Sequence, residues 1–208
     1  NCTIPTITQS DASTQNTDPL TVGHYNYTIT RTWTSTDVTG NATVSTQEIT
    51  VQDVTDPTIT DVADVTVNCE YNTTSTETVV ATGTANCTIP TITQSDASTQ
   101  NTDPLTVGHY NYTITRTWTS TDVAGNATVS TQEITVQDVT DPTITDVADV
   151  TVNCEDNTTS TETGVATGTD NCTIPTITQS DASTQNTDPL TVGHYNYTIT
   201  RTWTSTDV

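Results

Sequence analysis

The chain has 208 residues, contains no lysine, methionine or phenylalanine, and carries a formal net charge of −22 with an isoelectric point near 4.1. Its acidic residues are spread singly rather than in long runs. That distribution predicts a solvated, self-repelling surface and excludes nucleic acid and anionic membranes as partners. No hydrophobic run approaches the roughly 18–20 residues that cross a bilayer, so we expect no membrane span in this chain.

The sequence is repetitive, since Asn-Cys-Thr-Ile-Pro begins at positions 1, 86 and 171 and residues 1–85 therefore form one period. Residues 171–208 match residues 1–38 throughout. The first two copies differ at four positions only, which are Thr39 and Ala124, Tyr71 and Asp156, Val79 and Gly164, and Ala85 and Asp170. A period of this length predicts an array of domains rather than a short-repeat solenoid.

The module boundaries are predicted at Asp56-Pro57 and Asp141-Pro142, where a strand-like segment ends and proline holds the preceding residue extended. One complete module then covers residues 57–141. Residues 1–56 are a partial module that lacks its first strands. Residues 142–208 are a partial module that lacks its last strand.

Within the complete module we expect strands throughout and no helix, because threonine and valine are abundant and both favour pleated sheets. In chain order, residues 58–69 are a first strand region that is interrupted at 61–64. Residues 78–84 and 87–94 follow as strands, and residues 101–104 form a turn.

The strongest pattern runs from His109 to Asp122, where one side of the predicted strand carries aromatic and apolar residues and the other carries mainly threonine. Such strict alternation predicts a half-buried strand. A turn at 122–126 and a partner strand at 128–136 follow. We therefore predict an all-β chain of tandem Ig-like β-sandwich modules, with Trp33, Trp118 and Trp203 in their cores. Arg116 is expected to stack on Trp118 and pair with a carboxylate.

The five cysteines stand at positions 2, 69, 87, 154 and 172, so that long and short spacings alternate. The short spacings make Cys69 with Cys87 and Cys154 with Cys172 natural disulfide candidates, one per module, with the partner of Cys2 upstream of this chain. Pairing across the long spacings is the competing connectivity. Zinc ligands are usually separated by two to four residues, so a metal site is disfavoured. Disulfides indicate an oxidising, extracellular setting.

Aspartates gather at the predicted joints, and interdomain calcium would use such carboxylates to stiffen a stalk. The alternative is that they only keep a linker solvated. The candidate ligands are Asp53, Asp56, Asp61, Asp64, Asp138, Asp141, Asp146 and Asp149.

Several asparagines begin Asn-X-Ser/Thr sequons, and those at Asn72, Asn126 and Asn157 are the glycosylation candidates. His109 occurs once per module without a nucleophile or a second histidine at a recognisable spacing. No phosphate-binding glycine loop is present either, so the sequence favours a protein that is not an enzyme.

The repeat resembles the hyalin-type (HYR-like) repeat over its whole period. The resemblance is carried by Asp56-Pro57-Thr58-Ile59, by Val67-Asn68-Cys69 and Asn86-Cys87, and by Arg116-Thr117-Trp118-Thr119-Ser120-Thr121-Asp122 followed by Gly125-Asn126. It implies an Ig-like sandwich of extracellular adhesion proteins, such as the giant surface adhesins of Bacteroidota. Val123-Ala124-Gly125 stands where the common bacterial repeat has a cysteine-containing turn, which leaves one of that repeat's two usual disulfides.

These observations predict a structural role outside the cell, in which the modules form an adhesin stalk or a surface filament that holds a distal adhesive part. The partners are then neighbouring modules of the same chain, or other chains in lateral self-association. The alternative is an array of carbohydrate-binding modules that gains avidity from many copies, with exposed aromatics such as Tyr71 as contacts.

Overall fold

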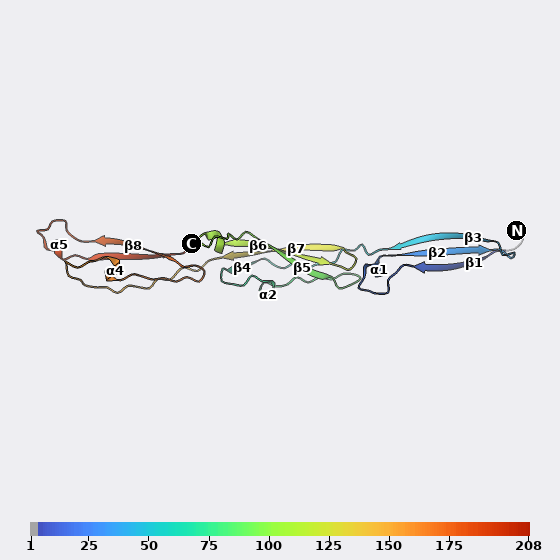
Figure 1. The fold of residues 1–208 in the computed structure, drawn as a ribbon, viewed down its shortest axis with the longest axis horizontal. Coiled ribbons are helices and arrows are strands. Elements are labelled where there is room, and N and C mark those ends of the chain that lie inside the picture. Colours follow the sequence, from blue (N-terminus) through green and yellow to red (C-terminus); the bar gives the residue numbers. More distant parts are fainter. Residues whose placement is uncertain (1–3) are drawn as a thin grey trace. The chain divides into compact units, whose positions relative to one another are not determined.

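The computed structural model describes residues 4–208, apart from the side chains of residues 76 and 77, so Cys2 lies outside the described residues. Most of the regular structure is β-strand, in agreement with the predicted composition of the fold (Figure 1). The elements in chain order are β1 (Thr6–Ser13), α1 (Val22–Tyr25), β2 (Tyr27–Thr36), β3 (Ala42–Val51), β4 (Val65–Asn68), α2 (Ser75–Thr78), β5 (Thr91–Ser98), α3 (Val107–Tyr110), β6 (Tyr112–Thr121), β7 (Ala127–Gln137), α4 (Ser160–Thr163), β8 (Thr176–Ser183), α5 (Val192–Tyr195) and β9 (Ile199–Thr206).

The strands form three sheets, with orders β1-β2-β3, β4-β7-β6-β5 and β8-β9. In the first and third sheets the same antiparallel hairpin recurs, so that Asp11 lies opposite Arg31 and Asp181 lies opposite Arg201. The strand β4 is different because it runs parallel to β7, from Val65 opposite Ile134 to Asn68 opposite Gln137. A parallel pair requires a long connection. The contacts of β4 therefore depend on a segment that is distant in the sequence.

Five helical turns of four residues each occur among the described residues, so the expectation of no helix is wrong. The turn α3 takes up His109, which the alternating pattern assigns to a strand, and β6 begins only at Tyr112. Its backbone is closed by His109 N–H donating to Thr106 O at 3.0 Å and Asn111 N–H donating to Val107 O at 2.8 Å. A single turn needs only a few local hydrogen bonds, so it forms despite a composition that disfavours longer helices.

The alternation along β6 agrees with its burial, since Ile114, Arg116, Trp118 and Ser120 are buried and the threonines between them are more exposed. The following turn is closed by Asp122, whose carboxylate accepts from Gly125 N–H at 2.8 Å and Asn126 N–H at 2.9 Å. Gly125 has a φ of +96°, a region that glycine enters without steric cost.

The chain divides into two compact units. The first comprises the chain up to Asp64 with Thr74–Ala97 and Thr115–Glu133, and the second comprises Val65–Thr73, Ser98–Ile114 and Ile134–Val208. Each unit has its own apolar cluster. In the first, Trp118 packs with Val62 and Ala81, and in the second, Ile114, Ile134 and Val136 are the buried members.

In the first unit, the extended segments around Thr58 and Thr84 provide the far side of the core. Thr58 N–H donates to Thr84 O at 2.7 Å, and Thr60 N–H donates to Thr82 O at 2.6 Å. Val62 and Ala81 on these segments contact Trp118, which is 2% exposed. Trp33 and Trp203, in the same sequence context, are only half-buried. Burial of this tryptophan thus depends on segments far from it in the sequence.

Val79 has a φ of +76°, in the left-handed region that disfavours a β-branched side chain, and its side chain is exposed. The next copy of the repeat has Gly164 at this position, with a φ of +114°. We expect Val79→Gly to raise the free energy of unfolding by about 1 kcal/mol, because relief of roughly 1–3 kcal/mol of strain exceeds the added entropy loss of glycine.

Urea unfolding followed by circular dichroism measures this difference. Gly164→Val is the matched control and must act in the opposite sense, because a Cβ at Gly164 would lie 2.6 Å from Val147 Cγ1. A loss of stability in Val79→Gly would contradict the assigned strain.

Candidate functional site

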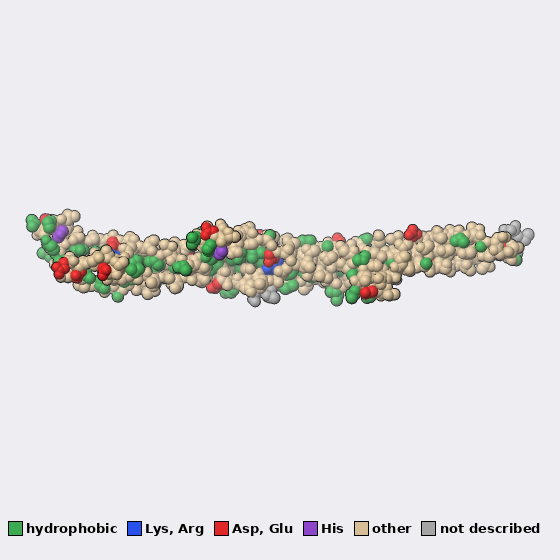
Figure 2. Space-filling model, viewed as in Figure 1, with side chains coloured by type: hydrophobic (Ala, Val, Ile, Leu, Met, Phe, Trp, Pro, Cys, Tyr) green, Lys and Arg blue, Asp and Glu red, His purple; other side chains and the backbone are tan. Residues whose placement is uncertain are grey.

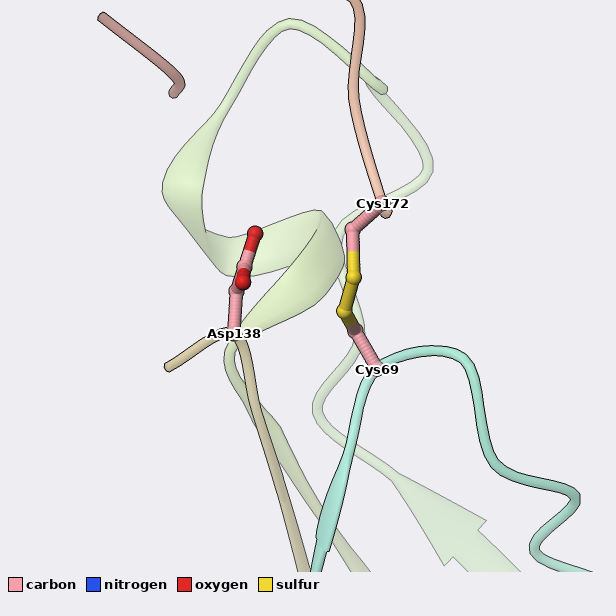
Figure 3. A group of neighbouring side chains, drawn as sticks. All are labelled: Cys69, Asp138 and Cys172. Atoms are coloured by element: carbon pink, nitrogen blue, oxygen red, sulfur yellow. A yellow bond between two sulfur atoms is a disulfide. The ribbon is translucent and has the colours of Figure 1, made fainter. Parts of the chain in front are cut away.

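The most distinctive chemical feature of the described residues is a disulfide between Cys69 and Cys172, whose Cα atoms lie 6.2 Å apart (Figure 3). Cys69 directly follows β4, and its N–H donates to Gln137 O at 3.1 Å, which continues the pairing of β4 with β7. Cys172 lies in the loop before β8, where its N–H donates to the Asp170 carboxylate at 2.9 Å. The strand pairing therefore fixes one sulfur, and a carboxylate-anchored turn fixes the other.

This bond corrects the predicted connectivity. The structure joins Cys69 to Cys172 instead of Cys87, and Cys154 is likewise not joined to Cys172, so Cys87 and Cys154 are exposed free thiols. The short spacing between Cys69 and Cys87 would let a flexible loop bring the two sulfurs together, but it does not force them to meet. The position of Cys69 is decided by the parallel pairing of β4 with β7, which a spacing count does not contain.

Three carboxylates lie at or near the disulfide. The Asp138 carboxylate lies beside the two sulfurs, as Figure 3 shows, and the ligand atoms of Cys69, Asp138 and Cys172 are within 4.8 Å of one another. Asp138, Asp170 and Asp207 form a second group within the same limit. Loss of hydration opposes ionisation of Asp170, but the backbone N–H groups of Cys172, Thr173 and Asn171 hydrogen-bond its carboxylate and hold its pKa below the usual range.

The sequence indicates Asp138 as a calcium candidate but does not single out Asp170 or Asp207. The sequence does contain one signal for this group, which is the replacement of Ala85 by Asp170 in the later copy. This difference adds a third carboxylate to the group in that copy only. Three carboxylates supply three to six of the six to eight oxygens that calcium takes, depending on whether each binds through one oxygen or two. Calcium at the joints remains a prediction.

The other aspartates that are calcium candidates occupy different settings. Asp61 accepts a hydrogen bond from Ser130 Oγ at 2.7 Å, and Asp64 accepts one from Glu133 N–H at 2.7 Å, so both hold β7. Asp53 is buried and accepts from Thr55 N–H at 3.2 Å. The four others are exposed and belong to no three-ligand group among the described residues: Asp56, Asp141, Asp146 and Asp149.

The free thiol of Cys87 lies against Asp53, the counterpart of Asp138 one repeat earlier. Loss of hydration around the sulfur raises the pKa of Cys87, and a hydrogen bond to Asp53 with the negative charges of Asp53 and Asp122 raises it further. Tyr25 Oη donates to the Cys87 carbonyl at 3.2 Å, and Asn86 Nδ2 donates to Asp53 Oδ1 at 3.2 Å. Thiol and carboxylate are thus held together.

We expect Asp53→Asn to increase the rate of alkylation of Cys87 by iodoacetamide severalfold at pH 8. Removing the negative charge lowers the thiol pKa, and the gain in thiolate exceeds the accompanying loss of intrinsic nucleophilicity. Mass spectrometry of the labelled peptide measures the rate. Asp56→Asn is the control and should leave the rate unchanged, whereas equal acceleration in both variants would contradict a direct effect of Asp53.

The single arginine of each repeat is bound by an aspartate of the neighbouring strand. Arg116 donates through Nε and Nη2 to both oxygens of Asp96 at 2.8 and 2.7 Å, and through Nη1 to Thr78 Oγ1 at 2.6 Å. Its Cζ lies 5.9 Å from the centroid of the Trp118 ring. Arg116 therefore has a carboxylate partner and an aromatic neighbour, the two kinds of contact that the sequence predicts. The sequence alone does not identify Asp96 as the carboxylate.

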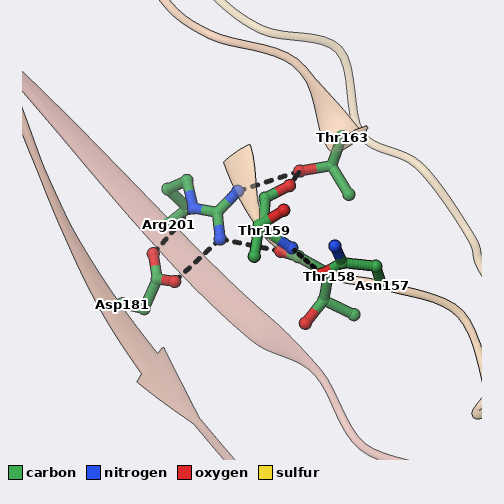
Figure 4. Close-up of polar contacts among 6 residues, drawn as sticks. All are labelled: Asn157, Thr158, Thr159, Thr163, Asp181 and Arg201. Carbon is green, nitrogen blue, oxygen red and sulfur yellow. Dashed lines mark hydrogen bonds and ion pairs between the residues drawn. The ribbon is translucent and has the colours of Figure 1, made fainter. Parts of the chain in front are cut away.

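Figure 4 shows the corresponding site around Arg201, which contacts Asp181, Thr163 and the Thr158 carbonyl. The Asn157 side chain accepts from Thr159 N–H at 3.0 Å and so shapes the turn that presents that carbonyl. The side chains of Arg31, Arg201 and Arg116 are 31%, 14% and 1% exposed. This trend indicates that the arginine has a structural role. Its side chain is fully buried only at Arg116, where the surrounding repeat is most fully packed.

The sequon residues also differ in setting. Asn126 Nδ2, the atom that a glycan would modify, donates to Asp53 O at 3.2 Å and Asp122 Oδ2 at 2.9 Å, so attachment there would break both bonds. Asn72 and Asn157 are exposed. Glycosylation at these two residues remains a prediction. His109 Nδ1 lies 2.7 Å from Asn101 O and thus helps to close the loop before β6.

No helix among the described residues is long and apolar enough to cross a membrane. Comparison of the chain with models of known protein families gives no match, and comparison with curated proteins gives none either. The likeness to the hyalin-type repeat therefore rests on the sequence motifs alone.

Proposed function

We propose that the chain is part of the repeat region of an extracellular adhesin stalk or surface filament, which holds a distal adhesive part away from the cell. The observation that carries the proposal is the combination of near-identical copies of the repeat with a disulfide that joins Cys69, in the module at 57–141, to Cys172, in the module that follows it. Persistent disulfides are typical of oxidising, extracellular compartments.

Covalent cross-linking is useful to a stalk because a stalk carries tension. The bond between Cys69 and Cys172 closes a loop of 103 residues, so a pulling force passes through the disulfide and not through that loop. The loop would otherwise contribute roughly 350 Å of extended chain, at about 3.4 Å per residue. The chain between the two cysteines is thereby shielded from being extended under load.

The surface is consistent with this role. Figure 2 shows that most of the visible face is neither hydrophobic nor charged and that acidic groups occur in scattered spots. With a net charge of −22, such a surface is hydrated and repels other copies of itself at low salt. Chains displayed densely on a cell would stay apart and extended.

The finer fold within this proposal is an Ig-like sandwich. It is supported by the cluster in which Trp118 of β6 packs against Val62 and Ala81, on the segments that pair at Thr58 and Thr84. In the proposed sandwich, the sheet that contains β6 is one layer and these extended segments belong to the other, with the cluster as the core between them.

The alternative, a carbohydrate-binding array, has weaker support. Tyr71 is exposed, but Tyr197 and Trp203 line a groove of about 640 Å³ that is also lined by Val150 and Val152. In the preceding copy, the counterparts of these two valines and of this tyrosine pack against Ile134 and Val136 of β7. The groove therefore has the composition of a core face that a strand equivalent to β7 would cover, not of a sugar platform.

Two measurements on the oxidised chain test the proposal. In small-angle X-ray scattering, the radius of gyration should clearly exceed the roughly 17 Å of a compact domain of this length. On a glycan array, the chain and its Tyr71→Ala variant should both fail to bind. A compact particle, or glycan binding that disappears in Tyr71→Ala, would overturn the stalk in favour of a globular or lectin-like role.

A further inference from the structure

The number of residues between the two bonded cysteines is related to the period of the repeat. Cys69 and Cys172 are 103 residues apart, which is one full period of the repeat plus the short spacing between Cys69 and Cys87. Cys172 is therefore the counterpart of Cys87 in the following copy. The bond joins one copy of the repeat to the next, and each copy contributes a different one of its two cysteines.

The two free thiols are counterparts of the two bonded cysteines. Cys154 corresponds to Cys69, and both follow an asparagine whose side chain accepts the cysteine N–H, at 3.0 Å from Asn153 and 2.9 Å from Asn68. The same local turn therefore presents both sulfurs. Cys154 is exposed and so is accessible to a partner.

Cys87 and Cys172 have a similar setting. Each lies beside the aspartate that follows a β-strand, Asp53 for Cys87 and Asp138 for Cys172. The Asp170 carboxylate that accepts Cys172 N–H has no equivalent before Cys87, where Ala85 stands. The asparagine that precedes each cysteine also makes a different contact. Asn171 Nδ2 donates to Cys69 Sγ at 3.7 Å, whereas Asn86 Nδ2 donates to Asp53.

We propose that Cys87 and Cys154 are the two halves of the same inter-repeat disulfide site, and that each pairs with the complementary cysteine of another copy of this repeat. At the separation of 103 that Cys69 and Cys172 show, Cys154 pairs with a cysteine downstream and Cys87 with one upstream. Every copy in an array is then bonded to the copy before it and to the copy after it. The pairing does not depend on the proposed stalk role.

The bond forms by two thiol–disulfide exchanges with a small disulfide such as oxidised glutathione. The thiolate of one cysteine attacks the small disulfide, forms a mixed disulfide and releases one glutathione thiolate. The thiolate of the complementary cysteine then attacks the protein sulfur of the mixed disulfide and releases the second. In sum, two protein thiols and one glutathione disulfide give one protein disulfide and two glutathione thiols.

The positions of the arginines allow the disulfide connectivity to be determined by digestion with trypsin. Trypsin cuts this lysine-free chain after Arg31, Arg116 and Arg201, so one fragment contains Cys69 with Cys87 and the next contains Cys154 with Cys172. Local pairs would lie within single fragments. Inter-repeat pairs would join successive fragments.

The test uses the chain as it stands and a chain lengthened at its C-terminus by one further copy of the repeat. Both are oxidised with glutathione disulfide, alkylated, denatured at mildly acidic pH to prevent exchange, and digested without reduction. In the original chain we expect fragments 32–116 and 117–201 to remain joined, with alkylated Cys87 and Cys154. In the lengthened chain, we expect Cys154 to be protected from alkylation and the fragment after Arg201 to be joined as well.

Cys154→Ser in the lengthened chain should release only that added fragment, whereas Cys69→Ser should separate fragments 32–116 and 117–201 from each other. Separation of all fragments before reduction would show local pairing and overturn the proposal. Alkylation of Cys154 in the lengthened chain, where its partner is present, would overturn it equally.

Discussion

Replacement of Cys172 by serine is expected to lower the free energy of unfolding by about 4–5 kcal/mol, since a cross-link that closes a loop of about 100 residues restricts the unfolded chain by that amount on the chain-entropy account. The bond spans 103 residues and closes the second compact unit, which contains both cysteines. Urea unfolding of the oxidised protein, followed by far-ultraviolet circular dichroism, measures the change.

The matched control is Cys154→Ser, which removes an exposed free thiol and should leave the free energy of unfolding unchanged. Local pairing of Cys154 with Cys172 would make the two variants equally unstable. That outcome would contradict the observed bond. Reduction of the unmodified protein should reproduce the effect of Cys172→Ser.

Arg116→Ala is expected to lower the free energy of unfolding by about 3 kcal/mol, the lower end of the range for breaking a buried ion pair. The guanidinium is 1% exposed and is hydrogen-bonded to Asp96 and Thr78. The Asp96 side chain is 37% exposed and can regain water once its partner is lost, which limits the cost. Chemical unfolding monitored by tryptophan fluorescence reports on the same core through Trp118.

Arg31→Ala is the control that this repeat offers, because it makes the same change in the same local sequence. Arg31 binds Asp11 in an exposed setting, and exposed ion pairs contribute little to stability. We expect no measurable loss of stability in that variant. Equal effects of the two substitutions would contradict the claim that burial gives Arg116 its importance.

The same ion pair predicts a dependence on pH. Hydrogen bonding from Arg116 lowers the pKa of Asp96 below its ordinary value of 3.8, against the opposing effect of burial. The folded pKa is thus lower than the unfolded one, so the stabilisation is present above pH 3.8 and is lost as the pH falls further. Arg116→Ala should lack this part of the acid dependence.

Much of the local structure follows directly from the sequence. The alternation along 112–121, the turn closed by Asp122 and the strand beginning at Ala127 all depend on residues close together in the chain. The period of the repeat is likewise visible without coordinates. The one-turn helices are missed because four residues contain too little pattern to outweigh a strand-favouring composition.

The tertiary structure decided which distant residues meet. Trp33, Trp118 and Trp203 have the same neighbours in sequence, yet only Trp118 is buried, in a cluster with Val62 and Ala81. Cys69 bonds to Cys172 and not to Cys87 because β4 pairs with β7. In a sequence of near-identical copies, the local pattern predicts which segments form strands and turns. It does not predict which copy supplies the partner strand or the partner cysteine, because several copies offer equivalent ones. The choice among them depends on which contacts can be satisfied together in three dimensions.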